Sequence, residues 1–243
     1  MNAMLRRLRQ IVSIVLVLLA AVWVTGEASQ WLLRRHAEKL LAEIRALEVG
    51  RSGWQDAQQM IGKWGRSGAP TGACTAEKCT YRIDLLQTLP QMLEGYPGGG
   101  AANWLPRALG RLGLRSAAVR AGFTVENGIV TEKWFGEQVT LPVRDWGRSG
   151  NYVPFLSASS RATAKFHDRT RDPDQAFPNR LVRAYPYGLS ATFSPEEDAS
   201  EQALLMDFRF SCITQRTPCV DASAILPEAS RTLQQERQQL QTR

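Results

Sequence analysis

The pattern of apolar and polar positions begins with an uninterrupted apolar stretch, residues 11–26, in which no side chain is charged. A helix of that length measures about 24 Å, which is less than the roughly 30 Å hydrocarbon core of a bilayer. The helical pattern continues past Glu27 as far as Leu33, and the longer segment measures about 34 Å. We therefore predict a transmembrane helix over residues 11–33.

Two interpretations of this segment are open. A retained signal anchor places Trp23 and Trp31 at the lipid headgroups, where aromatic rings that are partly apolar and partly polar are favoured. A cleaved signal peptide requires small residues near its end, and Ala28 and Ser29 meet that requirement. We favour the retained anchor because the helical pattern continues beyond these two residues.

Basic residues at the start of the chain predict the orientation of the helix. Arg6, Arg7 and Arg9 precede the apolar stretch with no acidic neighbour, whereas the basic residues after it start later and are interleaved with glutamates. Basic flanks tend to stay in the cytoplasm, so residues 1–10 form the expected cytoplasmic stub. We expect a protein that crosses the cell membrane once, with its carboxy-terminal domain outside the cytoplasm.

The next segment, residues 34–64, is predicted to be helical and juxtamembrane. One helix face carries a stripe of apolar residues, namely Leu33, Ala37, Leu40, Ile44 and Leu47. Such a stripe could form a dimeric coiled coil and so support self-association, but it lasts barely two heptads. Packing of the stripe on the protein's own domain is the favoured outcome. A second short helix is expected over residues 55–63.

Beyond these helices the apolar positions alternate, as in half-buried strands. Tyr81, Ile83 and Leu85 are separated by polar residues, which predicts a strand. The clearest signal is the Asn127-Gly128 pair between two alternating segments, because these two residues readily adopt the positive φ angles of a type I′ turn. We therefore predict an antiparallel hairpin over residues 119–141.

Other elements follow from weaker patterns. Strands are expected at residues 157–166 and 188–193, and a helix that starts at a Ser194 cap is expected to run to about residue 205. The remaining expectations are a short helix at residues 106–115, a strand through Phe208, Phe210 and Cys212, and a last helix from Pro227.

The order of these elements predicts an α+β fold. The transmembrane helix continues into the juxtamembrane helix, a mainly antiparallel β-sheet domain with a few helices occupies residues 65–226, and a polar helix or tail occupies residues 227–243. This layout resembles that of pilins. However, no glycine precedes the apolar stretch, and Val15 stands at its fifth position, where that family has glutamate. We therefore do not assign the chain to the pilins.

Charge adds little to this picture. The chain has a formal net charge of +7, and the three arginines of the stub leave 27 basic and 23 acidic residues from Glu27 onward, a net charge of +4. The arginines are spread along the chain without a dense basic block, so we expect no nucleic-acid partner.

The four cysteines fit an oxidising compartment. They form two local pairs in the sequence, Cys74 with Cys79 and Cys212 with Cys219, and we expect disulfide bonds. Local pairing is the simplest of the three possible connectivities, and a bridge between the two pairs is the alternative. A four-thiolate zinc site is disfavoured because its ligands usually come in tighter CxxC pairs.

The residues that could carry catalysis are few. Of the two histidines, His36 lies in the predicted juxtamembrane helix, where a surface position is expected. His167 lies close to Asp168 and follows three nearby serines, but no GxSxG turn presents a nucleophile. The three serines are Ser157, Ser159 and Ser160, and the aspartates after His167 that could instead bind calcium are Asp168, Asp172 and Asp174. We expect no catalytic residue, no cofactor and no metal ligand.

The sequence therefore predicts a location better than it predicts an activity. The leading hypothesis is a non-catalytic, membrane-anchored module that binds or scaffolds an envelope protein or a surface polymer. The residues at which an interface is expected are the exposed aromatics among Trp104, Trp134, Trp146 and Tyr152. The alternatives are a hydrolase that uses His167 and a subunit of a filament or secretion assembly.

Overall fold

The computed structural model describes residues 2–86, 113–140, 155–164, 180–185, 188–193, 199–217 and 219–242. Its helices and strands, in chain order, are α1 (Asn2–Ala46), α2 (Trp54–Trp64), β1 (Gly68–Pro70), β2 (Lys78–Leu86), β3 (Ala117–Glu126), β4 (Ile129–Thr140), β5 (Phe155–Thr163), β6 (Arg180–Tyr185), β7 (Gly188–Phe193), α5 (Ala199–Leu205), α6 (Ser211–Thr214), the 3-10 helix η3 (Ala222–Ala224) and α7 (Pro227–Gln241).

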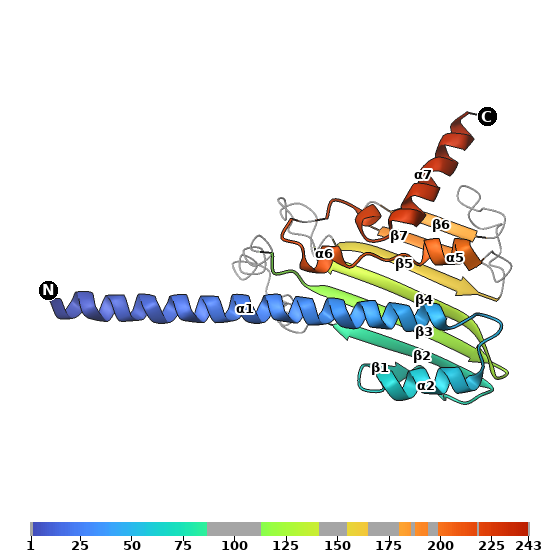
Figure 1. The fold of residues 1–243 in the computed structure, drawn as a ribbon, viewed down its shortest axis with the longest axis horizontal. Helices are drawn as coiled ribbons and strands as arrows, with labels where there is room; N and C mark the ends of the chain where they lie inside the picture. The colour runs from blue at the N-terminus through green and yellow to red at the C-terminus, as the bar shows by residue number, and fades with distance from the viewer. Residues whose placement is uncertain are drawn as a thin grey trace.

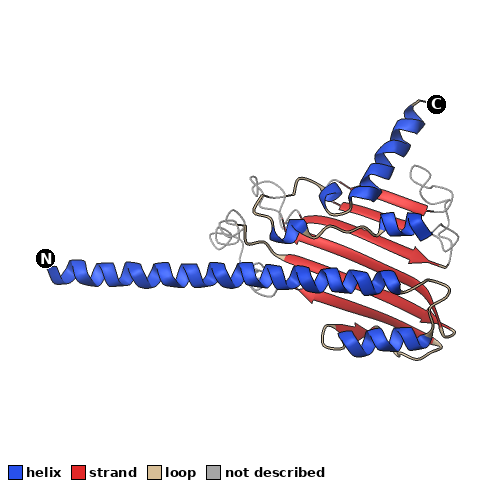
Figure 2. Ribbon diagram, viewed as in Figure 1, coloured by secondary structure: helices blue, strands red, loops and turns tan. Residues whose placement is uncertain are grey.

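The domain has two layers, a seven-stranded sheet and a set of helices that lie against one of its faces (Figures 1 and 2). The strand order is β1-β2-β3-β4-β5-β7-β6. Neighbouring strands are antiparallel except for β5 and β7, which are parallel. The α+β class is therefore as expected, and the sheet is mixed because the chain reaches β7 only after β6 has taken the outer position.

The two halves of helix α1 have different surroundings. Its first half projects beyond the domain and exposes its apolar side chains, whereas its second half lies along the middle of the sheet (Figure 1). The predicted stripe is buried there, with Ala37, Leu40 and Ile44 completely inaccessible to solvent. The stripe therefore packs on the protein's own sheet. Residues Arg6–Ala46 form a helix that is long and apolar enough to cross a membrane.

The β3–β4 hairpin forms as predicted around its Asn-Gly turn. Asn127 and Gly128 both have positive φ angles, 54° and 79°, and the two strands pair antiparallel on either side. The turn also receives the segment that joins α1 to α2, because the Trp54 amide donates to the Gly128 carbonyl at 2.9 Å. The hairpin therefore holds both helices at the end of the domain opposite the free half of α1 (Figure 1).

One predicted strand is wrong. Phe208 and Phe210 lie in an irregular segment outside the sheet, and Cys212 belongs to the short helix α6. Both phenylalanines are nevertheless buried, with ring centroids 4.8 Å and 5.8 Å from that of Phe135 on β4. The alternation therefore reflects burial against the sheet's helix-covered face, and a strand would have required a hydrogen-bonded neighbour.

Other differences concern one strand that was not predicted and two helices whose predicted starts lie outside the described residues. Strand β6 has no counterpart among the sequence predictions, whereas β5, β7, α2 and α7 lie close to their predicted ranges. Helix α5 is described from Ala199, so the expected cap at Ser194 lies outside the described residues. The helix predicted at 106–115 lies mostly outside them as well, and its described end, residues 113–115, is not helical.

Candidate functional site

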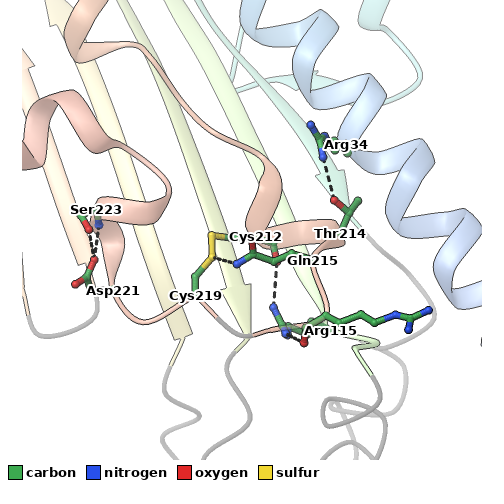
Figure 3. Close-up of a disulfide and its surroundings, with 9 residues drawn as sticks. Arg34, Arg115, Cys212, Thr214, Gln215, Cys219, Asp221 and Ser223 are labelled. Atoms are coloured by element: carbon green, nitrogen blue, oxygen red, sulfur yellow. Dashed lines mark hydrogen bonds between the residues drawn. A yellow bond between two sulfur atoms is a disulfide. The ribbon is translucent and has the colours of Figure 1, made fainter.

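The point at which α1 leaves the domain is built from three segments, which we call the collar. They are the α1 turns around Gly26 and Gln30, the segment Gly113–Arg115, and the loop closed by the Cys212–Cys219 disulfide (Figure 3). The collar lies where the free, apolar half of α1 meets the folded domain (Figure 1). Its contacts therefore fix the position of the domain relative to that half of the helix.

Gln30 and Gly26 bring α1 against the backbone of the second segment. The Gln30 amide is 1% exposed, and its Nε2 donates to the carbonyls of Gly113 at 3.0 Å and Arg115 at 3.4 Å. A Cβ added to Gly26 would lie only 2.6 Å from Cδ2 of Leu114. Both residues extend the buried stripe of α1 by two turns toward the amino terminus. The helix therefore packs on the domain over a greater length than the apolar stripe predicts.

Arg115 joins the second segment to the disulfide loop. The residue is 2% exposed, and its guanidinium donates to the carbonyl oxygens of Cys212 at 3.4 Å and Arg216 at 2.5 Å (Figure 3). Burial lowers the pKa of Arg115 from its ordinary value, but an arginine stays charged in proteins. A buried cation that is bonded to carbonyl dipoles stabilises the loop conformation because those carbonyls then need no water.

The disulfide loop is also bonded within itself and to α1. Gln215 Nε2 donates to the sulfur of Cys219 at 2.8 Å, and Arg34 of α1 donates to the hydroxyl of Thr214 at 3.1 Å (Figure 3). The exposed side chain of Arg216 extends from the same loop, with its guanidinium carbon 5.7 Å from the ring centroid of Trp23. The loop therefore reaches down to the apolar stretch of α1.

Two charged side chains of β4 point toward the helices. The β4 residues Lys133, Phe135, Glu137 and Val139 alternate with half-buried neighbours and are themselves buried. The Nζ of Lys133 donates to the carbonyl of Arg45 at 3.2 Å and to that of Leu47. These are carbonyls at the end of α1, where a cation is favoured by the helix dipole and by the unpaired acceptors.

The surroundings of the two groups move their pKa values in opposite directions. Burial lowers the pKa of Lys133 to about 8; Glu48 opposes the shift and Arg45 adds to it. Glu137 is completely buried, and burial raises its pKa well above the ordinary value, against the opposing charge of Arg34. Neither carboxyl oxygen of Glu137 has a hydrogen-bond partner among the described residues. The surroundings of Glu137 therefore favour the neutral, protonated form of its carboxyl.

The opposite face of the sheet carries no helix among the described elements, and we call it the open face (Figure 2). One row across it consists of Arg82, Gly122, Trp134, Arg161 and Thr192. The half-buried indole of Trp134 covers Gly122, where an added Cβ would lie 2.6 Å from the indole nitrogen. The row is therefore flat at its centre, with an arginine on each side of the tryptophan.

Ion pairs organise the charged side chains of the open face. Asp84 lies between Arg82, whose Nε is 2.8 Å from a carboxylate oxygen, and Arg120, whose Nε is 3.4 Å away. Arg161 pairs with Glu132 at 2.9 Å. All five side chains remain partly exposed, so each pair contributes little to stability but keeps its arginine in a defined position.

A shallow groove of about 420 Å³ lies between the end of α1 and α2. Its lining is mainly polar and includes Glu43, which pairs with Lys63 and accepts a 2.6 Å hydrogen bond from the indole nitrogen of Trp64. These bonds hold α2 against α1. Because Glu43 and Lys63 of its lining serve this packing, we assign the groove a structural role.

The structure describes some of the predicted site residues. Cys74 is bonded to Cys79 and Cys212 to Cys219, which is the local pairing. His36 is exposed on α1, as expected, and Trp134 lies on the open face. The residues outside the described ranges are Trp104, Trp146, Tyr152, His167, Asp168, Asp172 and Asp174. Among the described residues no group of histidine, cysteine and acidic side chains could hold a metal ion.

Three serines of the hydrolase alternative lie on β5 and alternate between the faces of the sheet. Ser157 and Ser159 face the same side as Trp134, whereas Ser160 is 1% exposed and lies beneath the helices. The Ser160 hydroxyl has no hydrogen-bond partner in the part of the chain that the structure describes. A substrate could not reach Ser160 without displacing the helices.

Comparison with known proteins gives no family for this chain. No family model, curated protein or solved structure matches it. Its function is therefore argued from its own geometry.

Sequence reasoning missed Arg115, Lys133 and Glu137. The strand alternation that includes Phe135 and Val139 also includes residues 133 and 137, so it contained the signal that two charged residues face the core. For Arg115 no comparable signal exists, because it lies outside regular structure and its partners come from a loop about a hundred residues later.

Proposed function

We propose that this protein is a single-pass membrane protein whose domain lies outside the cytoplasm and acts as a non-catalytic binding or scaffolding module of the cell envelope. The observation that carries the proposal is the continuity of α1, which runs without a break from the apolar stretch into the core of the domain. Removal of the exposed apolar half from water favours insertion into a bilayer. The two disulfides favour an oxidising compartment.

The shared helix also supports a scaffolding role. A flexible linker would let the domain swing freely, whereas α1 is gripped by the collar within three residues of Trp23 and stays packed as far as Leu47. From Trp23 to Leu47 the helix rises about 36 Å. The domain is therefore held upright, with the hairpin turn at Asn127 farthest from the membrane.

The open face is the surface that we propose for a partner. Its central tryptophan is half-buried rather than enclosed, and the arginines beside it are kept in place by Asp84 and Glu132. Tryptophan and arginine are enriched where proteins bind one another, because they combine a large contact area with a polar group. An envelope protein or a surface polymer is the proposed ligand.

Protease protection of the full chain tests the layout. In cells whose outer layer has been opened, added protease should degrade the domain and leave a membrane-embedded fragment that contains the apolar stretch. Complete protection in intact membranes, followed by degradation after lysis, would contradict the orientation. Recovery of the chain in the soluble fraction with reduced thiols would contradict the anchor itself.

A photo-crosslinking amino acid tests the open face. Placed at Arg82 in the full chain, it should form an adduct in its native envelope that is absent when the same group replaces Gln58, which is exposed on α2. Trp134→Ala should weaken that adduct because the flat centre of the row is lost. Equal adducts from both positions would contradict a partner-specific face.

A second candidate function is a subunit of a filament or secretion assembly. It is favoured by Trp31 and Leu32, which are 52% and 57% exposed on the side of α1 that faces away from the sheet. In an assembly this side of α1 could pack on a second copy of the helix. Crosslinking through a cysteine placed at Leu32 would distinguish the candidates, because a scaffold that acts as a monomer gives no dimer.

A further inference from the structure

We propose that the collar is a lipid-binding surface, in which Arg216 binds the phosphate groups of phospholipids in the leaflet from which α1 emerges. The inference rests on the proposed membrane anchoring and adds to it a specific contact between the domain and the lipid headgroups. It starts from one contact, since the Arg216 guanidinium lies 5.7 Å from the ring of Trp23 within the apolar half of α1.

The first step is that no flexible linker separates the apolar half of α1 from the domain. Gly26, only three residues beyond Trp23, is buried against Leu114, and Gln30 donates two hydrogen bonds to the backbone of Gly113 and Arg115. Three residues of helix rise about 4.5 Å. A domain that begins so close to the apolar stretch touches whatever surrounds Trp23.

The second step is the length of the span. Because Gly26, Gln30 and Leu33 pack on the domain, the part of α1 that is exposed on every side ends near residue 25. The apolar side chains from Ile11 to Val24 cover about 21 Å, which is shorter than a hydrocarbon core of roughly 30 Å. A short span is accommodated by thinning of the bilayer and by drawing its flanks toward the headgroups. The flank here is the collar.

The third step is charge. Arg216 is exposed and pairs with no carboxylate among the described residues, while Arg115 is buried directly behind it and Arg34 bonds the same loop. Glu27 is the only acidic residue of α1 before Glu38, so the collar is positive overall. Arginine forms paired hydrogen bonds with phosphate, and tryptophan favours the headgroup level. The chemistry of the exposed loop therefore matches a phospholipid headgroup.

The disulfide explains why the loop can hold this position. Cys212–Cys219 closes the loop, and the Arg115 guanidinium holds the Arg216 carbonyl, so the backbone beneath the exposed side chain has little freedom. A preordered arginine loses less conformational entropy on binding than one on a free loop.

The test uses the full chain in phospholipid vesicles. A nitroxide on Thr217→Cys, next to Arg216 and exposed, reports contact with lipid, and the same label on Arg51→Cys, with a side chain 84% exposed near the far end of α1, is the matched control. Mass spectrometry first verifies that both native disulfides are intact. We expect a headgroup-bound relaxing agent to broaden the label at position 217 and to leave that at position 51 unaffected.

Lipid charge provides the second measurement. With a quencher attached either to phosphatidylglycerol or to phosphatidylcholine headgroups, a fluorophore at position 217 should be quenched more by the anionic lipid. Arg216→Gln should lower that preference about fivefold, as expected for one basic group at an anionic surface, and Arg216→Lys should retain most of it. Arg51→Gln is the control and should leave the preference unchanged.

The outcomes separate this inference from the anchoring on which it rests. If the chain floats with the vesicles but positions 217 and 51 respond alike, or if Arg216→Gln retains the full preference for phosphatidylglycerol, the lipid-binding collar is refuted and the anchor stands. If the chain does not float with the vesicles, both proposals fail.

Discussion

Gly26 of α1 lies directly against the side chain of Leu114, so closely that a Cβ at position 26 would lie 2.6 Å from Cδ2 of that leucine. Leu114 is itself only 6% exposed. This contact is where the exposed apolar half of the helix becomes part of the domain, and a side chain at position 26 would fit only if Leu114 moved. The helix and the domain therefore depend on each other at this point.

We predict that Gly26→Leu destabilises the folded domain by about 1–3 kcal/mol, because the added side chain overfills the contact with Leu114. Thermal unfolding of the full chain in detergent, followed by circular dichroism, measures the effect. Gly62→Ala is the control, since nothing lies within 4 Å of its added Cβ and alanine favours helix, so it should stabilise α2 by about 0.5–1 kcal/mol. Equal effects of the two changes would contradict the Gly26 contact.

A second prediction concerns pH and Glu137. The folded-state pKa of this carboxyl is raised by burial, so between its ordinary value and the raised value the unfolded chain has lost a proton that the folded chain keeps. The free energy of unfolding should therefore fall as pH rises through that window, by about 1.4 kcal/mol per pH unit. Glu137→Gln should remove this slope and match the parent near pH 4.

Denaturant unfolding at a series of pH values checks the prediction. The matched control on the same strand is Glu132→Gln, because Glu132 is partly exposed and paired with Arg161 at 2.9 Å. That variant should keep the downward slope. If the parent protein is equally stable at pH 5 and pH 8, the buried carboxyl does not behave as proposed.

A third prediction separates the two disulfides. Replacing Cys212 and Cys219 by alanine should cost roughly 2 kcal/mol through the entropy of the unfolded chain, and so should replacing Cys74 and Cys79. Only the first pair of changes should also accelerate hydrogen exchange in residues 113–116, because Arg115 bonds to the carbonyl of Cys212. Exchange in residues 113–116 that stays as slow as in the parent would indicate that the collar does not need its disulfide.

A fourth prediction concerns the hairpin turn. Gly128 has a φ of 79° with nothing within 4 Å of its added Cβ, so Gly128→Ala meets backbone strain and no steric clash. We expect a loss of about 1–2 kcal/mol in denaturant unfolding. Asn127→Gly keeps the turn accessible and should change stability by less. A neutral Gly128→Ala would mean that the turn relaxes to another type.

Local patterns sufficed for much of the fold. The stripe from Leu33 to Leu47, the Asn127-Gly128 turn and the proline at the start of α7 each depend on neighbours in the sequence, and each lies where it was predicted. The strand expected at Phe208 and Phe210 failed because alternation reports which side chains are buried, whereas a strand needs a partner strand.

The collar could not be predicted in the same way. Gln30 and Arg115 are polar residues without any local pattern, and each becomes buried only because a distant segment supplies carbonyl acceptors. Trp134 was a candidate for an exposed interface, but its place over Gly122 depends on the register of β3 and β4. The position of the arginines beside it depends on the same sheet.

By itself, the sequence determined the apolar amino-terminal helix and the class of the fold, and it favoured local cysteine pairs, since periodicity, charge and spacing act over short distances. The tertiary structure decided where the exposed apolar half of α1 ends, which charged residues are buried and which face of the sheet is left open. These properties arise from contacts between segments far apart in the chain, such as Gly26 with Leu114 and Trp23 with Arg216, and no local pattern encodes them.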